Sequence, residues 1–194
     1  LVVRMKGITK IYPNGIAANR EVDFSVKAGE IHALIGENGA GKSTLMKILG
    51  GVEKMDAGSV QFNGREARLR SASQAAELGI GMVHQEFMLI PEFTVTENIK
   101  LGREIGETTA LSKLFGPLLD KLNWKQMSGD SRKALDSIGM MNIEEYTKVA
   151  GMPIGYKQFV EIAREIDKSG IKLLVFDEPT AVLTESEADR LLEI

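Results

Sequence analysis

The sequence contains no cysteine, which excludes a disulfide framework and any metal site built on thiolates. It also lacks an apolar run that approaches the ~20 residues needed to cross a bilayer. There is no basic excess: 27 acidic and 24 basic side chains give a net charge of -3, which argues against a nucleic-acid-binding protein. Arg4 and Lys6 interrupt the first apolar residues, so we expect no signal peptide. The 194 residues are 43% apolar, which is enough for a packed core.

Short apolar or alternating runs dominate the first half of the chain and predict strands. Turn signals such as Pro13–Gly15 separate them. The predicted strands are 21–27, 30–35, 59–63 and 81–85, and the predicted helices between them are 42–49 and 72–78. The two histidines, His32 and His84, are assigned to packing on these strands.

The pattern changes at Thr94, which forms a predicted capping box with Glu97. From there to about residue 150 we find no convincing strand and predict a helical insertion. An amphipathic helix over 155–168, an apolar strand over 173–176 and a last helix after Thr184 then restore the mixed pattern. The sequence therefore predicts an α/β fold: a mostly parallel sheet core with an antiparallel N-terminal portion, interrupted by a helical subdomain. The boundaries are 1–93 for the first part of the core, 94–150 for the helical subdomain and 151–194 for the rest of the core.

A phosphate-binding motif follows the strand predicted over 30–35. Residues 36–43 read GENGAGKS and match GxxxxGK[ST], the P-loop, immediately before a predicted helix. Glycines let the backbone N–H groups approach phosphates, lysine adds a positive charge, and the serine hydroxyl suits Mg²⁺. The candidate nucleotide-binding residues are Gly36, Asn38, Gly39, Ala40, Gly41, Lys42, Ser43 and Thr44.

Two acidic residues, Asp177 and Glu178, end the apolar strand predicted over 173–176. In a parallel sheet the carboxyl ends of strands face the ligand. Asp177 is therefore a candidate for holding Mg²⁺, and Glu178 is a candidate general base that polarises the attacking water.

The P-loop, the long gap from Lys42 to Asp177, and the sequence FDEPT over 176–180 together resemble the ABC ATPases. The resemblance implies a P-loop NTPase fold whose helical subdomain lies between these two motifs. It implies ATP and Mg²⁺ as cofactors, with Ser43, Gln85 and Asp177 near the metal. Gln85, in the sequence VHQEF over 83–87, resembles the Q-loop glutamine and joins Glu178 as a catalytic candidate. Tyr12 is at the place of an aromatic residue that stacks on adenine.

Residues 82–99 and 158–163 resemble a narrower group, the importers of simple sugars and nucleosides, in which two ATPase domains are fused in tandem. This implies that the chain is the N-terminal domain of a longer protein on the cytoplasmic side of the cell membrane. The implied partners are membrane permease subunits, which meet the loop after Gln85, a second ATPase domain and, indirectly, an extracytoplasmic solute-binding protein. No nucleic acid is expected among them.

The chain departs from the family pattern at the signature LSGGQ, which aligns with Met152–Tyr156. Pro153 replaces the serine and offers neither a hydroxyl nor an N–H group to a phosphate. The family's switch histidine is expected beyond residue 194. We therefore expect the isolated chain to hydrolyse ATP very slowly.

Three other functions are weighed against a transport motor. A GTP-binding switch would share the P-loop, but no Asn-Lys-x-Asp motif exists to read guanine. A nucleotide-binding module without hydrolysis fits Pro153 but not the intact Gln85 and Glu178. An ABC ATPase of DNA repair or translation would favour a basic surface or a long coiled arm, and neither is indicated.

Overall fold

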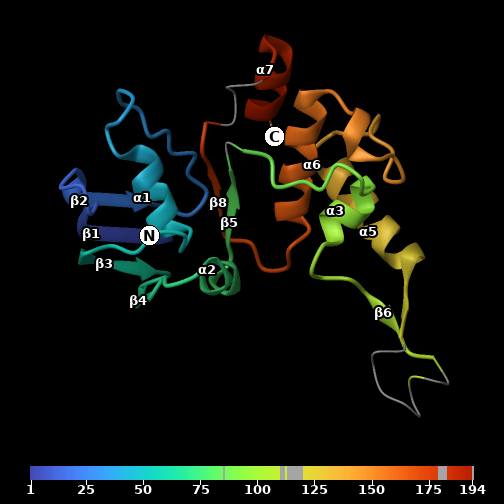
Figure 1. Cartoon of the computed structure of the whole chain (residues 1–194), viewed down its shortest axis with the longest axis horizontal. Helices are drawn as coiled ribbons and strands as arrows, with labels where there is room; N and C mark the ends of the chain where they lie inside the picture. Colours follow the sequence, from blue (N-terminus) through green and yellow to red (C-terminus); the bar gives the residue numbers. More distant parts are fainter. Residues whose placement is uncertain (85, 110–111, 113–119, 179–182, 194) are drawn as a thin grey trace. The chain divides into compact units, whose positions relative to one another are not determined.

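The computed structural model describes residues 1–84, 86–109, 112, 120–178 and 183–193 (Figure 1). The chain forms two compact units, which are Leu1–Met82 with Ser169–Asp177, and Val83–Lys168 with Glu178–Ile194. Within the described residues, no helix is both long enough and apolar enough to cross a bilayer.

The first unit is built on a four-stranded sheet in the order β2-β1-β3-β4, and all three neighbouring pairs are antiparallel. The antiparallel N-terminal portion predicted from the sequence is therefore confirmed. The strands are β1 Val3–Ile11, β2 Ala17–Val26, β3 Ala57–Phe62 and β4 Arg65–Glu66. Our sequence prediction missed β1 because Arg4 and Lys6 break its apolar run. Arg4 and Lys6 are exposed, whereas Val3, which precedes Arg4, and Met5, which lies between the two, are buried.

Helix α1 (Lys42–Leu49) covers one face of this sheet (Figure 1). Its buried residues Leu45, Ile48 and Leu49 share one apolar core with Met5 and Val60 of the sheet. Helix α2 (Ala72–Leu78) begins after Ser71, whose side chain accepts the Gln74 N–H at 3.3 Å, and ends at left-handed Gly79. Both helices have the bounds predicted from the sequence.

Two further strands, β5 (Ile80–Val83) and β8 (Leu173–Phe176), are neighbours in a two-stranded sheet although they lie far apart in the sequence. They confirm the predicted strand 173–176 and most of the predicted strand 81–85. Residue 85 lies outside the described residues. Of the four residues of β8, only Val175 is buried.

The strand predicted over 30–35 is wrong. The segment belongs to no strand, and Ile31 and Ile35 are 94% and 89% exposed. Alternating apolar residues favour a strand, but a strand also needs a hydrogen-bonded neighbour, and none of the described strands pairs with this segment. His32 is therefore not part of a strand, but it packs on strand β2, as predicted. It lies edge-on to Phe24, with ring centroids 5.1 Å apart, and bonds Glu30 at 2.9 Å.

The second unit is mainly helical. The predicted capping box is present, since the Glu97 carboxylate accepts the Thr94 N–H at 2.6 Å and the Thr94 hydroxyl accepts the Glu97 N–H at 3.2 Å. Our sequence prediction missed the short antiparallel pair of β6 and β7. The elements are α3 Val95–Lys100, β6 Gly106–Glu107, β7 Lys121–Leu122, α5 Trp124–Ser137, a 3-10 turn Val149–Gly151, α6 Ile154–Ile166 and α7 Glu185–Glu193.

A buried ion cluster joins α3, α5 and α6. The Lys100 ammonium bonds both oxygens of Asp167, at 2.7 and 2.9 Å, and reaches Asp130 at 3.3 Å. Arg103 also donates to Asp167, at 2.8 Å. Lys100 and Asp167 are almost fully buried, so each needs the opposite charge of the other to remain ionised there.

These units differ from the boundaries that the sequence predicted. Helix α6 and helix α7 group with the helical unit, whereas 151–194 was assigned to the rest of the core. The reason is packing, because α6 contacts α3 and α5 along its buried face. The assignment of 151–194 to the ATPase core stays a prediction.

Candidate functional site

The P-loop residues form an exposed loop that leads into α1. Gly39 and Gly41 have left-handed φ angles of 84° and 82°, and the turn is closed by the Ala40 N–H, which bonds the Glu37 carbonyl at 3.1 Å. Left-handed glycines leave backbone N–H groups facing a ligand without a side chain in the way. The loop opens into the N-terminus of α1, whose dipole favours an anion.

Gly41 has a second reason to be glycine. A Cβ atom at this position would overlap the backbone carbonyl of Ala18 in β2. Asn19, next in β2, is buried and donates from its amide to the Gly41 carbonyl at 3.2 Å. Asn19 therefore anchors the P-loop to the sheet. The sequence reasoning did not identify it, although a buried asparagine in a strand needs such a partner.

The Lys42 side chain folds back over the loop. Its ammonium donates to the carbonyls of Gly36 at 2.7 Å and Glu37 at 2.9 Å. These neutral acceptors are replaceable, and a phosphate would offer a stronger, charge-assisted bond. The predicted phosphate-binding lysine is thus held at the loop that is predicted to cradle the phosphates.

Ser43 and Asp177 come together at the start of α1 and the end of β8. The Ser43 hydroxyl donates to the Asp177 carboxylate at 2.9 Å, and Asp177 is buried. Mg²⁺ prefers oxygen ligands and is bound in proteins through one or two such groups together with substrate phosphates. A hydroxyl and a carboxylate in contact beside a P-loop fit that donor set.

Tyr12 follows β1 and lies near the same end of α1. Its hydroxyl is 3.4 Å from the hydroxyl of Thr44, and the Lys10 ammonium is 5.4 Å from the centroid of its ring. The lysine takes up one face of the aromatic ring by a cation–π contact. A stacking base would use the other face. Tyr12, Thr44, Lys42, Ser43 and Asp177 all belong to the first unit.

The structure says less about the two predicted catalytic residues, Glu178 and Gln85. Glu178 directly follows Asp177, is exposed and has a left-handed φ of 52°. It belongs to the second unit. Gln85 lies outside the described residues. The roles of both residues stay predictions.

The segment that aligns with the signature begins α6. Pro153 is the N-cap of this helix and makes no side-chain capping bond. A Cβ atom on Gly155 would overlap the carboxylate of Glu187 from α7. The Tyr156 hydroxyl accepts a bond from the Asn142 amide at 2.6 Å. The retained glycine is therefore explained by close packing within the second unit.

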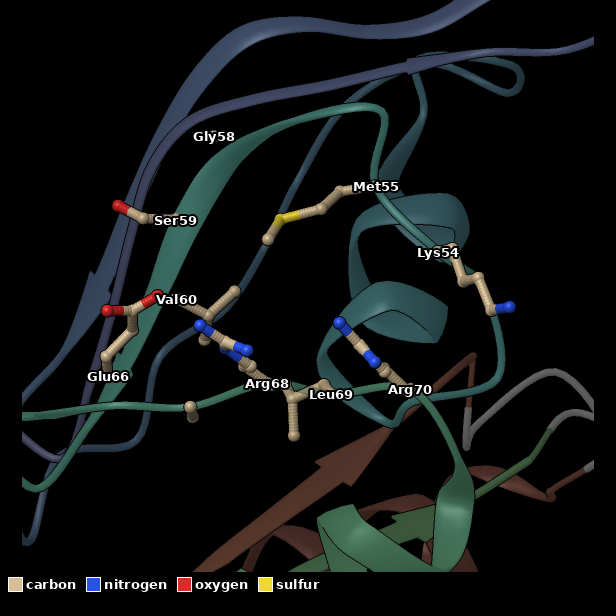
Figure 2. A pocket seen from close by; sticks show the side chains of 10 residues that line it. Lys54, Met55, Gly58, Ser59, Val60, Glu66, Arg68, Leu69 and Arg70 are labelled. Carbon is tan, nitrogen blue, oxygen red and sulfur yellow. The ribbon is translucent and has the colours of Figure 1, made fainter.

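A separate cavity of about 280 Å³ lies in the first unit between β3 and residues 66–70 (Figure 2). Met55, Val60 and Leu69 form its apolar part, and the basic residues around it are Lys54, Arg68 and Arg70. None of its lining residues belongs to the P-loop. The cavity is thus distinct from the candidate nucleotide site.

Comparison with known proteins places this geometry in a family. Residues 19–181 match the family described as "ABC transporter". The ribose import ATP-binding protein of Chromobacterium violaceum is 43% identical over 99% of this chain and 36% of its own length. The guanosine import ATP-binding protein of Bacillus subtilis is 42% identical over 100% of this chain and 35% of its own length.

Among solved structures, an ATP-binding cassette of an ABC transporter in its ADP conformation has a TM-score of 0.81 and 26% identity, covering 99% of this chain and 74% of that chain. This confirms the predicted fold class. The chain spans about a third of the length of the curated relatives that it matches. A match over most of the chain, joined to a P-loop in contact with a strand-end aspartate, shows that this chain belongs to the ABC transporter family.

Proposed function

We propose that this chain is the ATP-binding and ATP-hydrolysing motor domain of a bacterial importer for a sugar or nucleoside. The observation that carries the proposal is the contact between Ser43 and Asp177, because it unites the P-loop with the second acidic motif. Relatives named for ribose, xylose and guanosine import favour import over DNA repair or translation.

Each residue has a role that follows from its chemistry. Lys42 exchanges its two carbonyl acceptors for phosphate oxygens, and the P-loop N–H groups hold the same anion. Ser43 and Asp177 offer oxygen ligands for Mg²⁺, with Gln85 as a further one. When bound, Mg²⁺ neutralises phosphate charge. Glu178 accepts a proton from the attacking water.

The partners of the proposed motor are membrane permease subunits, a second ATPase domain and, through the permease, an extracytoplasmic solute-binding protein. On this proposal the chain works at the cytoplasmic face of the membrane. The relatives are nearly three times longer than this chain, which leaves room for a second ATPase domain in the natural protein.

The test is ATP turnover by the natural full-length protein assembled with its membrane subunits and solute-binding protein in proteoliposomes. Ribose, xylose, L-arabinose and guanosine are supplied in turn. We expect one of these solutes, or a close analogue, to raise the ATPase rate, and Lys42→Ala to abolish turnover. Equal turnover with and without every sugar and nucleoside would contradict import of this class.

A further inference from the structure

The cavity between β3 and residues 66–70 is surrounded by more positive than negative charge. Lys54, Arg68 and Arg70 line it together with the carboxylate of Glu66. The chain as a whole carries a net charge of -3, so this part of its surface differs in sign from the whole. The lining residues that the structure describes all belong to the first unit. The charge around the cavity favours an anionic ligand.

The side chains of Arg68 and Arg70 extend to the same side of the chain segment that carries them (Figure 2). Ala67 and Leu69, which flank Arg68, are buried, so the segment alternates as an extended chain does. Within the described part of the chain, neither guanidinium takes part in a hydrogen bond or an ion pair. A guanidinium is always charged, and its planar set of N–H donors matches a phosphate. Two such groups at one cavity suit a doubly charged phosphate.

The backbone that carries the two arginines is fixed at both of its ends. The Ala67 N–H donates to the Val60 carbonyl in β3 at 2.8 Å, and the Arg70 N–H donates to the Gln74 side chain in α2 at 3.0 Å. Leu69, between these two anchors, packs in the apolar core of the first unit. The guanidinium groups therefore project from an ordered segment, which lowers the entropy that is lost when they bind a ligand.

The cavity also offers groups that bind hydroxyls and an apolar surface. The Ser59 hydroxyl and the Glu66 carboxylate line it, and neither is hydrogen-bonded to another residue that the structure describes. A carboxylate accepts hydrogen bonds from ligand hydroxyls, and a serine hydroxyl donates or accepts them. Figure 2 shows Glu66 and Arg70 at opposite ends of the lining, with the thioether of Met55 on the side that faces the two arginines. A ligand with a phosphate at one end and hydroxyls at the other therefore matches the lining.

We propose that this cavity is a second ligand site, which binds a small sugar phosphate separately from the nucleotide site. Arg68 and Arg70 bind the phosphate through charge-assisted hydrogen bonds, and Ser59 and Glu66 bind the sugar hydroxyls. The cavity volume of about 280 Å³ is close to the lower end of the ~300–1,000 Å³ range of small-molecule pockets, which suits a pentose or hexose phosphate. The proposal goes beyond ATP-driven import, because binding here requires neither hydrolysis nor a membrane subunit.

The experiment titrates the full-length protein with ribose 5-phosphate and with glucose 6-phosphate, and we expect at least one of them to bind. Arg68→Gln and Arg70→Gln should each raise its Kd by about tenfold to a hundredfold, because charge-assisted bonds to the phosphate are lost. Both arginines are exposed, so neither substitution disturbs the core. Arg65→Gln, in β4 and outside the cavity lining, is the matched control and should stay within twofold of wild type. Lys42→Ala should also bind the sugar phosphate as wild type does, because the P-loop is not part of this site.

A second readout locates the bound ligand. In protein whose methionine methyl groups are labelled with ¹³C, the sugar phosphate should shift the resonance of Met55, which lines the cavity. The resonance of Met141, which is exposed in the second unit, should not move. Met55→Leu identifies the Met55 signal by its disappearance. This readout does not depend on how well the arginine variants fold.

Further ligands separate a sugar phosphate from other sources of the same phosphate group. Free ribose and inorganic phosphate should each bind at least tenfold more weakly than ribose 5-phosphate, because each offers only part of the contacts. The headgroup of phosphatidic acid is also a phosphate monoester, but it lacks the hydroxyls that Ser59 and Glu66 would bind. Phosphatidylcholine vesicles that contain phosphatidic acid should therefore bind wild type and Arg68→Gln equally.

The proposal is overturned if neither sugar phosphate binds, if both arginine variants bind it as tightly as wild type, or if the Met55 resonance does not shift. Vesicle binding that depends on Arg68, without binding of either sugar phosphate, overturns it in favour of a lipid headgroup. None of these results bears on ATP-driven import, whose test is ATP turnover. Conversely, a wild-type complex without solute-stimulated turnover would leave this site unaffected, because its binding is measured without hydrolysis.

Discussion

The Ser43 hydroxyl donates a 2.9 Å hydrogen bond to the carboxylate of Asp177, which joins the first turn of α1 to the residue after β8. The two residues are 134 positions apart. Tertiary folding thus brings two predicted Mg²⁺ ligands to one place, and this contact gives the first prediction.

Asp177→Asn should weaken Mg-ATP binding by about tenfold to a hundredfold, because a charge-assisted interaction worth ~1.5–3 kcal/mol is lost. Binding of ATP in EDTA should change little. Titration with and without Mg²⁺ measures both values. Asp23→Asn, whose carboxylate accepts the Gly7 N–H on β1, is the control. Equal losses with and without Mg²⁺ would remove Asp177 from the metal site.

Tyr12→Ala should weaken ATP binding by ~1–3 kcal/mol, because stacking of a base on the aromatic ring is lost. Tyr12→Phe keeps the ring and loses only the 3.4 Å contact with Thr44, so its affinity should stay within about threefold of wild type. GTP should show the same losses, since stacking does not distinguish purines. If Tyr12→Phe loses as much ATP affinity as Tyr12→Ala, the effect belongs to the hydroxyl and not to stacking on the ring.

Glu178→Gln in the full-length protein should retain ATP binding and lose steady-state hydrolysis, because an amide cannot accept the proton of the attacking water. The measurements are the Kd for ATP and the release of phosphate. Glu185→Gln, in the first turn of α7, is a control of the same chemistry. Near-normal turnover in Glu178→Gln would show that another group acts as the base.

Pro153 predicts asymmetry between two ATP sites. On the proposed function, the resemblance to ABC ATPases implies a head-to-tail pair of ATPase domains in which the Met152–Tyr156 segment faces the partner's P-loop. Pro153 is then expected to weaken the partner's site. Loss of a hydroxyl and an N–H donor removes up to two bonds of ~1.5–3 kcal/mol each. Lys42→Ala in the full-length protein should therefore abolish nearly all hydrolysis.

Pro153→Ser in the same protein should change the rate little, because the partner's P-loop is expected to be impaired as well. Phosphate release by the two variants is compared with the wild-type rate. If Lys42→Ala retains about half the activity, the two sites are equivalent and the asymmetry is refuted.

Glu161→Gln should stabilise the chain at pH 8, and the gain should shrink as pH falls. Burial raises the pKa of Glu161, with a further rise from Glu165, against the opposing effects of the Met88 N–H, Arg164 and Lys168. The folded chain therefore binds this proton more readily than the unfolded chain, and wild type loses stability as pH rises through the raised pKa. Glutamine does not titrate.

Urea unfolding of both proteins from pH 4 to pH 8 measures this difference. The prediction is wrong if wild type has the larger free energy of unfolding at pH 8 and the difference grows with pH. That result would mean that the ion pair of Glu161 with Arg164 stabilises the chain by more than burial of the carboxylate destabilises it.

The sequence by itself determined the local features of this protein. The bounds of α1 and α2, the capping box at Thr94, the helix after Thr184 and strand β8 were all predicted, because each depends on residues within a few positions of one another. The P-loop was equally readable, since its glycines, Lys42 and Ser43 are contiguous. The family followed from such short motifs and their spacing.

Only the tertiary structure decided which distant residues meet. Residues 30–35 have the pattern of a strand, but strand formation depends on a neighbour that the pattern does not encode. Three further contacts cannot be predicted from the sequence pattern. The Asn19 amide bonds the Gly41 carbonyl, the Met88 N–H bonds the Glu161 carboxylate, and Gly155 packs closely against Glu187. Each joins side chains and backbone groups from separate elements, and their meeting depends on how those elements pack.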